Sequence, residues 1–349
     1  AGHGRSVGDH VSAEARSATN VEVSVVDPGL VWQFAGQGAL KVGVLVNLFD
    51  SEDVFRDRLA DCDIILKSHL GFGATELLYP ANGGEVSVSV AVAEKMLMET
   101  RYSQPILVAL EYSLSEVWLS RGVHPSAVMG HSLGEYAAAV VAGVLTLEDC
   151  LRVVCERGRL MQESDECVGS MVAVRASAAD VVEAIKEMRV SSEVSLAAIN
   201  GPRSVVVSGS QSGVDKVLRS TALSGCGHRA LKVSCAFHSP LMASISDDLE
   251  VVLRSVKFCR PTIRMISTVT GAYVDEELLT VSYWLQHMMQ PVLYMSALET
   301  VQVDFRGLEG CAIIEMGADS TLSRLAATIV RDSIPSIKCS TIADMASYI

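Results

Sequence analysis

Short apolar runs alternate with segments of helical periodicity along most of the chain, the pattern of an α/β protein. Apolar runs with the length of a buried strand occur at residues 30–34, 127–129, 263–268 and 311–315. Apolar spacing of three and four predicts helices at 55–70, 90–98, 104–119, 133–142, 147–162, 241–256, 283–287 and 322–330, and another beginning at residue 291. Pro105 would then lie near the first turn of its helix, where its missing N–H costs little. Residues 337–349 show no clear pattern.

The pattern changes between residues 169 and 233. Strands are expected at 171–175, 194–199, 204–207 and 229–233, and helices at 177–188 and 212–223. This βαββαβ order is the ferredoxin-like arrangement, and roughly 65 residues lie within the usual range of domains that fold alone. We therefore predict a small domain at 169–233 inserted into a larger α/β domain formed by residues 29–168 and 234–349. Residues 1–28 lack periodicity and predict a disordered linker or an expression remnant.

Composition narrows the class of protein. The 349 residues are 49% apolar and 20% charged, which suits a globular protein with an ample core. A net charge of −13 argues against nucleic acid as a partner. The longest nearly apolar run, residues 136–145, is too short for a membrane span, and no signal-peptide pattern opens the sequence. Nine scattered cysteines without a CxxC pair indicate a reducing, cytoplasmic location and no metal site.

The segment Gly130-His-Ser-Leu-Gly134 joins a predicted strand to a predicted helix. Two glycines around a serine at such a junction allow a turn sharp enough to expose the hydroxyl of Ser132 at the positive end of the helix. A nucleophilic serine is one interpretation. A glycine-rich turn with a capping serine is the other, because matches to GxSxG also arise by chance. A second glycine-flanked residue, Gln37, follows the strand at 30–34, where open α/β sheets place their sites.

Two further polar residues, Arg157 and His238, are candidates for a functional site, although each also has a purely structural interpretation. In the helix at 147–162, Arg157 falls at the edge of the apolar stripe and is turned toward the interior. A buried guanidinium needs a carboxylate or a polar cavity. Helix geometry alone favours an internal salt bridge, or an arginine that extends past the helix edge to solvent, over a binding role. His238 lies in a loop before Pro240, where it could meet Ser132 or serve as a structural histidine.

Taken together, these motifs resemble the malonyl-CoA:acyl-carrier-protein transacylase family, and most closely the acyltransferase domains of type I polyketide and fatty acid synthases. The resemblance covers residues 30 to 335. It rests on these ordered segments: Gly36-Gln-Gly38, Gln104-Pro105 with Ala109-Leu-Glu-Tyr112, Gly130-His-Ser-Leu-Gly-Glu-Tyr136, Arg157-Gly-Arg-Leu-Met-Gln162, Asn200-Gly-Pro202 with Val207-Ser-Gly209, Ala236-Phe-His-Ser-Pro-Leu-Met242, and Tyr283-Trp284 with His287 and Pro291-Val292. The fold that it implies is an α/β-hydrolase-like large domain with a ferredoxin-like small domain.

The resemblance implies a Ser–His dyad that transfers malonyl groups. Ser132 would be the nucleophile and His238 the base, oriented by a backbone carbonyl from the segment around His287. The N–H groups of Gln37 and Leu133 would form the oxyanion hole. The substrate-binding residues would be Arg157, which would grip the malonyl carboxylate, and His131, Phe237 and His287.

No permanently bound cofactor is implied. The expected partners are malonyl-CoA as the coenzyme A thioester substrate, an acyl carrier protein bearing phosphopantetheine, and neighbouring domains of a larger synthase. The bulk of Phe237 would crowd an α-methyl group and so favour malonyl over methylmalonyl, although one methyl group discriminates only weakly. The sequence departs from the family pattern at Ala39-Leu40, Thr268, Met289 and Gly317-Ala-Asp319.

Two other functions fit parts of the pattern. A serine hydrolase or thioesterase would use the same elbow, but it would want an acid between Ser132 and His238, and an inward Arg157 would have no obvious use in it. A non-catalytic docking domain would need none of the four residues Ser132, His238, Arg157 and Gln37.

Overall fold

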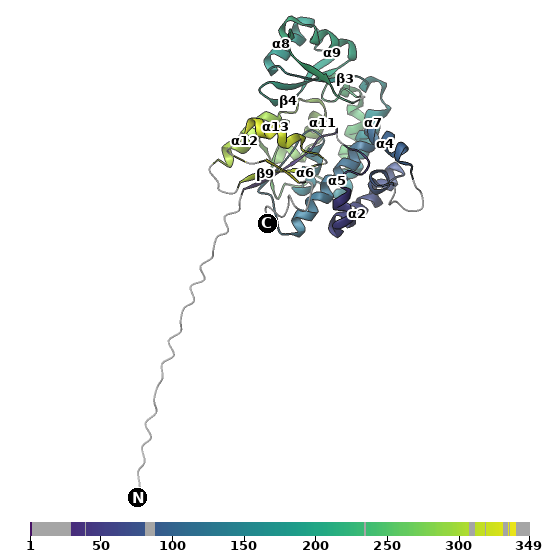
Figure 1. The fold of residues 1–349 in the computed structure, drawn as a ribbon, viewed down its shortest axis with the longest axis vertical. Coiled ribbons are helices and arrows are strands. Elements are labelled where there is room, and N and C mark those ends of the chain that lie inside the picture. The colour runs from purple at the N-terminus through teal and green to yellow at the C-terminus, as the bar shows by residue number, and fades with distance from the viewer. Residues whose placement is uncertain are drawn as a thin grey trace.

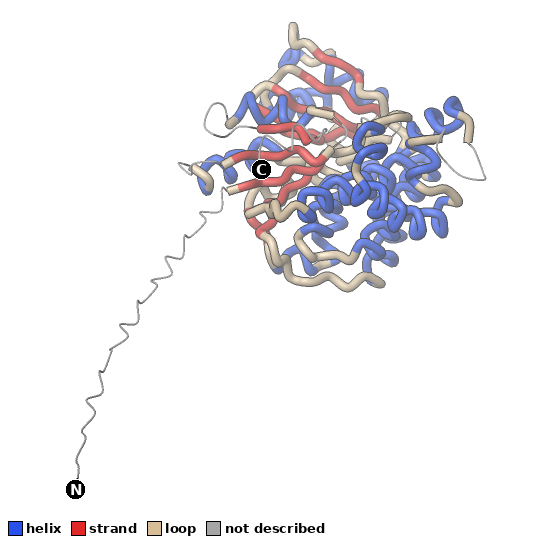
Figure 2. Tube along the Cα trace, turned by 60° about the horizontal axis from the view of Figure 1, so that its bottom comes forward, coloured by secondary structure: helices blue, strands red, loops and turns tan. Residues whose placement is uncertain are grey.

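The computed structural model describes Ala1 and residues 29–38, 40–80, 88–233, 235–306, 311–317, 319–330, 334 and 336–339. These residues form two lobes (Figure 1), a large one around a six-stranded sheet and a small one around a four-stranded sheet. The linker predicted over residues 1–28 lies, apart from Ala1, outside the described residues. Figure 2 shows the two sheets, one in each lobe.

The sheet of the large lobe is parallel except at one edge. Its order is β10-β9-β1-β2-β7-β8, and only the β7–β8 pair is antiparallel. The strands are β1 (Leu30–Phe34), β2 (Ala127–Gly130), β7 (Arg264–Ile266), β8 (Tyr273–Val274), β9 (Ala312–Met316) and β10 (Ser336–Cys339). Every residue of β1, β2 and β9 is buried, as expected of strands covered on both faces. Their register places the last residues of all three at one edge of the sheet.

Helices surround this sheet. They are α1 (Val46–Ser51), α2 (Asp53–Leu70), α3 (Ala74–Leu78), α4 (Val90–Met98), α5 (Thr100–Ser120), α6 (Gly134–Val141), α7 (Leu147–Glu163), α10 (Ser246–Arg254), α11 (Val281–Met289), α12 (Tyr294–Asp304) and α13 (Thr321–Ile329). Short 3₁₀ helices lie at Asp165–Cys167, Pro240–Ile245 and Glu276–Leu279, so the helix predicted at 241–256 is divided in two. Among the described helices, none combines the length and the apolar character that crossing a membrane requires.

The prediction for Pro105 is wrong. Helix α5 begins at Thr100, so Pro105 lies in the second turn, where it removes a donor from the helical hydrogen bonds. The extra turn is anchored from outside the helix, because the backbone N–H of Thr100 donates to Oε1 of Gln162 on α7 at 2.9 Å. This contact joins residues far apart in sequence, and therefore no local pattern could reveal it.

The small lobe has the predicted βαββαβ order, and the predicted fold class is confirmed. Its elements are β3 (Ser170–Val174), α8 (Ala178–Met188), β4 (Val194–Gly201), β5 (Ser204–Gly209), α9 (Gln211–Leu218) and β6 (His228–Ala230). The strand order is β4-β5-β3-β6 with antiparallel pairs throughout. The helix predicted at 212–223 is shorter, and a 3₁₀ turn at Thr221–Leu223 follows it. The exact domain boundaries stay a prediction.

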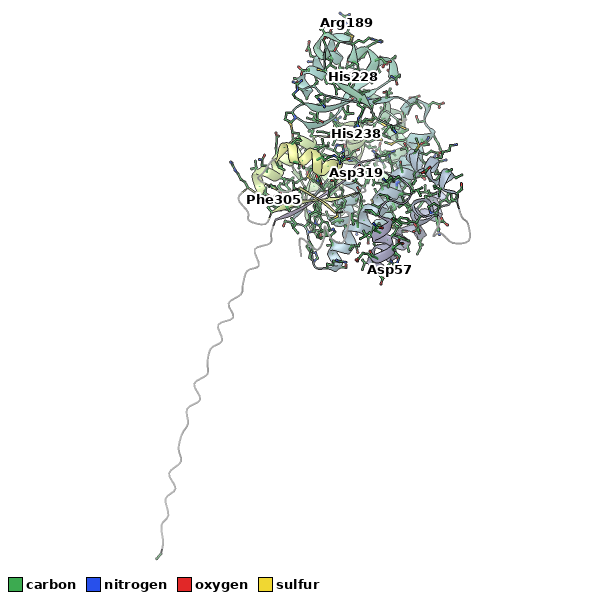
Figure 3. The ribbon with its side chains drawn as sticks, viewed as in Figure 1. Asp57, Arg189, His228, His238, Phe305 and Asp319 are labelled. Carbon is green, nitrogen blue, oxygen red and sulfur yellow. The ribbon has the colours of Figure 1, made fainter. Side chains whose placement is uncertain are left out.

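The two lobes contact each other through β4. The N–H of Ile199 donates to the carbonyl oxygen of Val292 at 2.9 Å. The N–H of Val292 donates to the carbonyl oxygen of Ala197, also at 2.9 Å. In Figure 3, His238 and Asp319 lie where the lobes meet, between Arg189 at the outer end of the small lobe and Asp57 at the far end of the large lobe. A cavity of about 390 Å³, lined by residues of both lobes, opens at this junction.

Candidate active site

The serine of the GxSxG segment stands at a sharp turn between β2 and α6. Ser132 has φ 52°, in the left-handed region that side chains rarely adopt. A Cβ at Gly130 would lie 2.0 Å from the backbone nitrogen of Glu135, and a Cβ at Gly134 would lie 2.2 Å from the carbonyl oxygen of Phe34. Both glycines are therefore required by close backbone packing, and the turn leaves Ser132 on the cavity wall.

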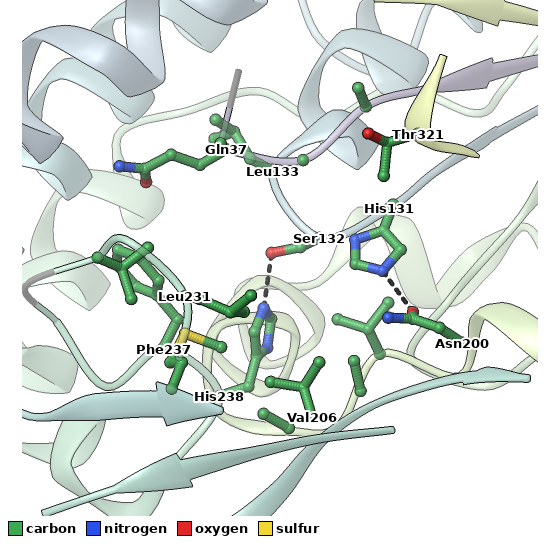
Figure 4. A pocket seen from close by; sticks show the side chains of 18 of the residues that line it. Gln37, His131, Ser132, Leu133, Asn200, Val206, Leu231, Phe237, His238 and Thr321 are labelled. Atoms are coloured by element: carbon green, nitrogen blue, oxygen red, sulfur yellow. Dashed lines mark hydrogen bonds between the residues drawn. The ribbon is translucent and has the colours of Figure 1, made fainter. Parts of the chain in front are cut away.

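The side chains of Ser132 and His238 meet in the wall of the cavity (Figure 4). The serine Oγ lies 2.6 Å from Nε2 of His238, and Nδ1 of the same ring lies 2.8 Å from the carbonyl oxygen of Gln290. A carbonyl only accepts, so Nδ1 carries the proton and Nε2 is left with a lone pair for the serine hydroxyl. Burial, followed by the charge of Arg157, lowers the pKa of His238 to about 3. The ring is therefore a neutral acceptor at physiological pH.

The backbone N–H groups of Gln37 and Leu133 belong to two segments that line the cavity beside Ser132. In the described part of the chain, neither group donates a hydrogen bond. A hydrogen bond at Ala35 holds the segment that carries Gln37. The N–H of Ala35 donates to Oε1 of the fully buried Glu111 at 2.7 Å. These positions are compatible with an oxyanion hole, the role that the sequence predicts for them.

Arg157 is a buried cation without a carboxylate partner among the described residues. It is 1% exposed and lines the cavity, and its Nη1 donates to Oε1 of Gln104 at 2.5 Å. Its Nε has no partner in the described part of the chain, and burial lowers its pKa. The internal salt bridge that the sequence left open is absent from these residues. A buried guanidinium in this state can accept an anion from the cavity.

His131 and Phe237 also line the cavity (Figure 4). Nε2 of His131 lies 2.8 Å from Oδ1 of Asn200 on β4, a contact between the two lobes. Burial lowers the pKa of His131, which keeps its ring neutral. Phe237 precedes His238 in the chain, is 8% exposed, and contributes to the lining of the same cavity as Ser132.

His287 does not line the cavity. It lies behind the elbow, 2% exposed, with Nε2 2.9 Å from the backbone carbonyl oxygen of Ser132. Helix α11 buries it because it follows Tyr283 by one turn, on the face that packs against α6. This position favours support of the Ser132 backbone over contact with a substrate, in contrast to the substrate-binding role predicted from the sequence.

A buried polar cluster lies beside His287. Oε2 of Glu135 is 2.6 Å from the hydroxyl of Tyr283, and Oε1 is 2.6 Å from the hydroxyl of Thr268. The Thr268 hydroxyl also lies 2.9 Å from the carbonyl oxygen of Gly130. Burial raises the pKa of Glu135 to about 7. Thr268, a departure from the family pattern, thus connects the end of β2 to the cluster.

Several polar residues that build this site are not identified as functional by the sequence motifs. These residues are Gln104, Glu111, Glu135, Asn200 and Gln290. Four of the five lie in motifs that carried the resemblance, and Glu111 and Glu135 are charged residues within buried helical segments. A charge in a buried helical segment is a signal that points to such residues, but only the structure identifies their partners.

Known proteins resemble the chain across both lobes. The family described as "Acyl transferase domain" matches residues 31–344. Polyketide synthase GfsB of Streptomyces halstedii is 36% identical over 323 residues, 92% of this chain. Erythronolide synthase EryA2 of Saccharopolyspora erythraea is 35% identical over 264 residues, 76% of this chain. The chain spans only 5% of the first of these relatives and 7% of the second.

Solved structures share the two-lobed fold. The acyltransferase domain from the second module of the salinomycin polyketide synthase is 32% identical with a TM-score of 0.77, covering 88% of this chain and 68% of that one. FabD from Acinetobacter baumannii is 26% identical with a TM-score of 0.79, covering 92% of this chain and 97% of that one. The fold is therefore that of acyltransferase domains.

Proposed function

Since the chain belongs to the acyl transferase domain family, we propose that it moves a malonyl group from coenzyme A to the phosphopantetheine thiol of an acyl carrier protein. The observation that carries the proposal is the meeting of three side chains in one cavity. Ser132 and His238 form a hydrogen-bonded pair, and the buried guanidinium of Arg157 lines the same cavity.

In the first half-reaction, Oγ of Ser132 attacks the thioester carbonyl carbon while Nε2 of His238 takes the hydroxyl proton. The N–H groups of Gln37 and Leu133 stabilise the negative charge that develops on the carbonyl oxygen. The carbon–sulfur bond then breaks, and His238 returns the proton to the thiolate of coenzyme A. The product is a malonyl ester of Ser132.

The second half-reaction reverses these roles. His238 takes the proton of the phosphopantetheine thiol, and the sulfur attacks the ester carbon. The bond from carbon to Oγ of Ser132 breaks, and the oxygen regains the proton from His238. No third reactant is consumed, so the cycle balances. A backbone carbonyl of Gln290 orients the histidine throughout and takes no proton.

Arg157 indicates that the acyl group carries a free carboxylate. Its charge has no carboxylate partner among the described residues, and the free carboxylate of a malonyl group would supply one through two parallel hydrogen bonds. An acetyl group has no such carboxylate. Phe237 lines the cavity, and its bulk favours malonyl over methylmalonyl, by at most a few kcal/mol for one methyl group.

The longer relatives support a further proposal about context. This chain spans 5% of GfsB and 15% of the hybrid synthetase ATPKS of Aspergillus niger. We therefore propose that it works beside other domains of a larger synthase and receives its carrier protein from that assembly.

The second candidate, a thioesterase or hydrolase on the same elbow, rests on the shared Ser132–His238 pair. A hydrolase triad would place an acid at Nδ1 of His238, and that nitrogen instead bonds to the backbone carbonyl of Gln290. A cationic Arg157 in the cavity favours an anionic acyl group, for which a simple ester hydrolase has no need.

Intact-mass spectrometry after mixing with malonyl-CoA tests the proposal. We expect a malonyl adduct on the native chain, none on Ser132→Ala, and transfer of the adduct to a carrier protein. Arg157→Ala should lose malonyl loading and keep acetyl loading. A docking domain would give no adduct with any acyl-CoA, and a thioesterase would release free malonate faster than it transfers the group.

A further inference from the structure

Gln104 connects the residue that would bind the acyl carboxylate to the loop that would bind the oxyanion. It lies on α5 and is 1% exposed. Its Oε1 accepts from Nη1 of Arg157 at 2.5 Å, and its Nε2 donates to Oε1 of Gln37 at 3.1 Å. The Nε2 of Gln37 in turn donates to Oγ of Ser103 at 2.8 Å.

The orientation of the Gln104 amide is set by Arg157. A guanidinium has donors only, so it must face the amide oxygen and never the amide nitrogen. The nitrogen is thereby directed toward the Gln37 side chain, which both Ser103 and Gln104 hold. The Gln37 side chain extends along the cavity wall and not toward Ser132 (Figure 4). Its amide therefore anchors the loop, and its backbone N–H remains available to the cavity.

The neutrality of Gln104 is as important as its geometry. Each of its contacts could be made by another polar side chain, but a carboxylate here would pair with Arg157 and cancel its charge. The amide holds the guanidinium by one nitrogen and leaves the cation without a counterion in the described part of the chain. A buried cation in that state gains most from an anionic ligand, since both are shielded from water.

We propose that Gln104 is a specificity-determining residue, which keeps Arg157 charged and open to an anionic acyl group and ties the Gln37 loop to that clamp. The inference deepens the proposed function and rests on it. Gln104 acts through Arg157 and Gln37, so it is a positioning residue and touches no reacting atom.

The test compares Gln104→Glu with the native chain, measuring acyl-enzyme formation from malonyl-CoA and acetyl-CoA by rapid quench and intact mass. The substituted carboxylate has the same shape but pairs with Arg157. We expect malonyl loading to fall about 100-fold, acetyl loading to fall far less, and the malonyl preference to drop by at least about tenfold. Gln162→Glu is the matched control, because its acceptor oxygen binds the Thr100 N–H outside the cavity; it should change neither rate more than about twofold.

Gln104→Met separates the two roles and serves if the Glu variant fails to fold. It leaves Arg157 charged and without a counterion, but it removes both the tether to Gln37 and the acceptor of Nη1 of Arg157. We expect kcat to fall roughly tenfold for both acyl groups, with the malonyl preference retained. Unchanged kcat values in this variant, or equal losses for both substrates in Gln104→Glu, would overturn the inference.

Loading measurements on the native chain and on Arg157→Ala show whether only the role of Gln104 is wrong or the proposed function as well. If the native chain loads malonyl, and Arg157→Ala abolishes that loading, while Gln104→Glu keeps the native preference, only the role of Gln104 is wrong. If the native chain loads acetyl but never malonyl, the proposed function is wrong, and the inference is overturned with it.

Discussion

The hydroxyl of Ser132 and the ring of His238 meet at 2.6 Å although 106 residues separate them, and both residues have a positive φ, 52° and 57°. A left-handed backbone is costly for residues with a side chain and persists where the surrounding packing enforces it. Here the strain lies at the two residues that would perform the chemistry. The fold thus orients both side chains before any substrate arrives.

The low pKa of His238 predicts how loading depends on pH. In the proposed mechanism the neutral ring is the base, and its pKa of about 3 lies below the ordinary 6.5, so protonation should not limit the rate until the medium is strongly acidic. We expect kcat/KM for acetyl-CoA to stay level from about pH 8 to about pH 5. In Arg157→Ala the acid limb should move to higher pH, because a charge that opposes the imidazolium is gone. A native limb centred at pH 6.5 would contradict this prediction.

Glu111 should support catalysis through a hydrogen bond and not through charge. Its pKa is raised well above the usual value by burial, and its Oε1 holds the N–H of Ala35. Glu111→Gln keeps that acceptor, so we expect kcat within about threefold of native. Glu111→Leu removes that acceptor and leaves the N–H only the longer contact with the carbonyl oxygen of Met316 at 3.4 Å, so it should lower kcat roughly tenfold or more with little change in KM. Steady-state kinetics decide, and a fully active Leu variant would exclude this role.

Glu135 should make stability depend on pH. Because its folded pKa of about 7 exceeds the unfolded 4.5, the contribution of its proton to stability is complete below pH 4.5 and is lost as the pH rises through 7. Glu135→Gln does not titrate. We expect the native chain to lose roughly 3 kcal/mol relative to this variant between those two pH values. Urea unfolding at several pH values measures this loss. Glu166→Gln, at an exposed position and with Glu135 intact, should follow the native pH dependence.

Gly130 should tolerate no side chain. A Cβ there would lie 2.0 Å from the nitrogen of Glu135, which is backbone and cannot move aside. We expect Gly130→Ala to destabilise the chain by more than about 4 kcal/mol or to prevent folding. Gly227→Ala is the control, because nothing lies within 4 Å of its Cβ, and it should stay within about 0.5 kcal/mol of native. Similar melting temperatures for both variants would count against the tight elbow.

Some features of this site followed from neighbours in the sequence. The order of strands and helices, the GxSxG turn and the inward direction of Arg157 depend on local periodicity and on backbone geometry, which a short segment encodes by itself. Local patterns were insufficient at Pro105, because a contact with a residue distant in sequence extends α5 by a turn. They were also insufficient at His287, for which the motif predicted contact with the substrate, whereas the residue packs behind Ser132.

By itself, the sequence determined which residues are candidates for the chemistry and which face of each element is apolar. Only the tertiary structure decided which atoms meet. Gln104 reaches Arg157 across 53 residues, Glu111 reaches Ala35 across 76, and Glu135 reaches Thr268 across 133. Such contacts form because a buried polar group must find a partner, and the partner available is whichever the packing of the whole chain brings within reach.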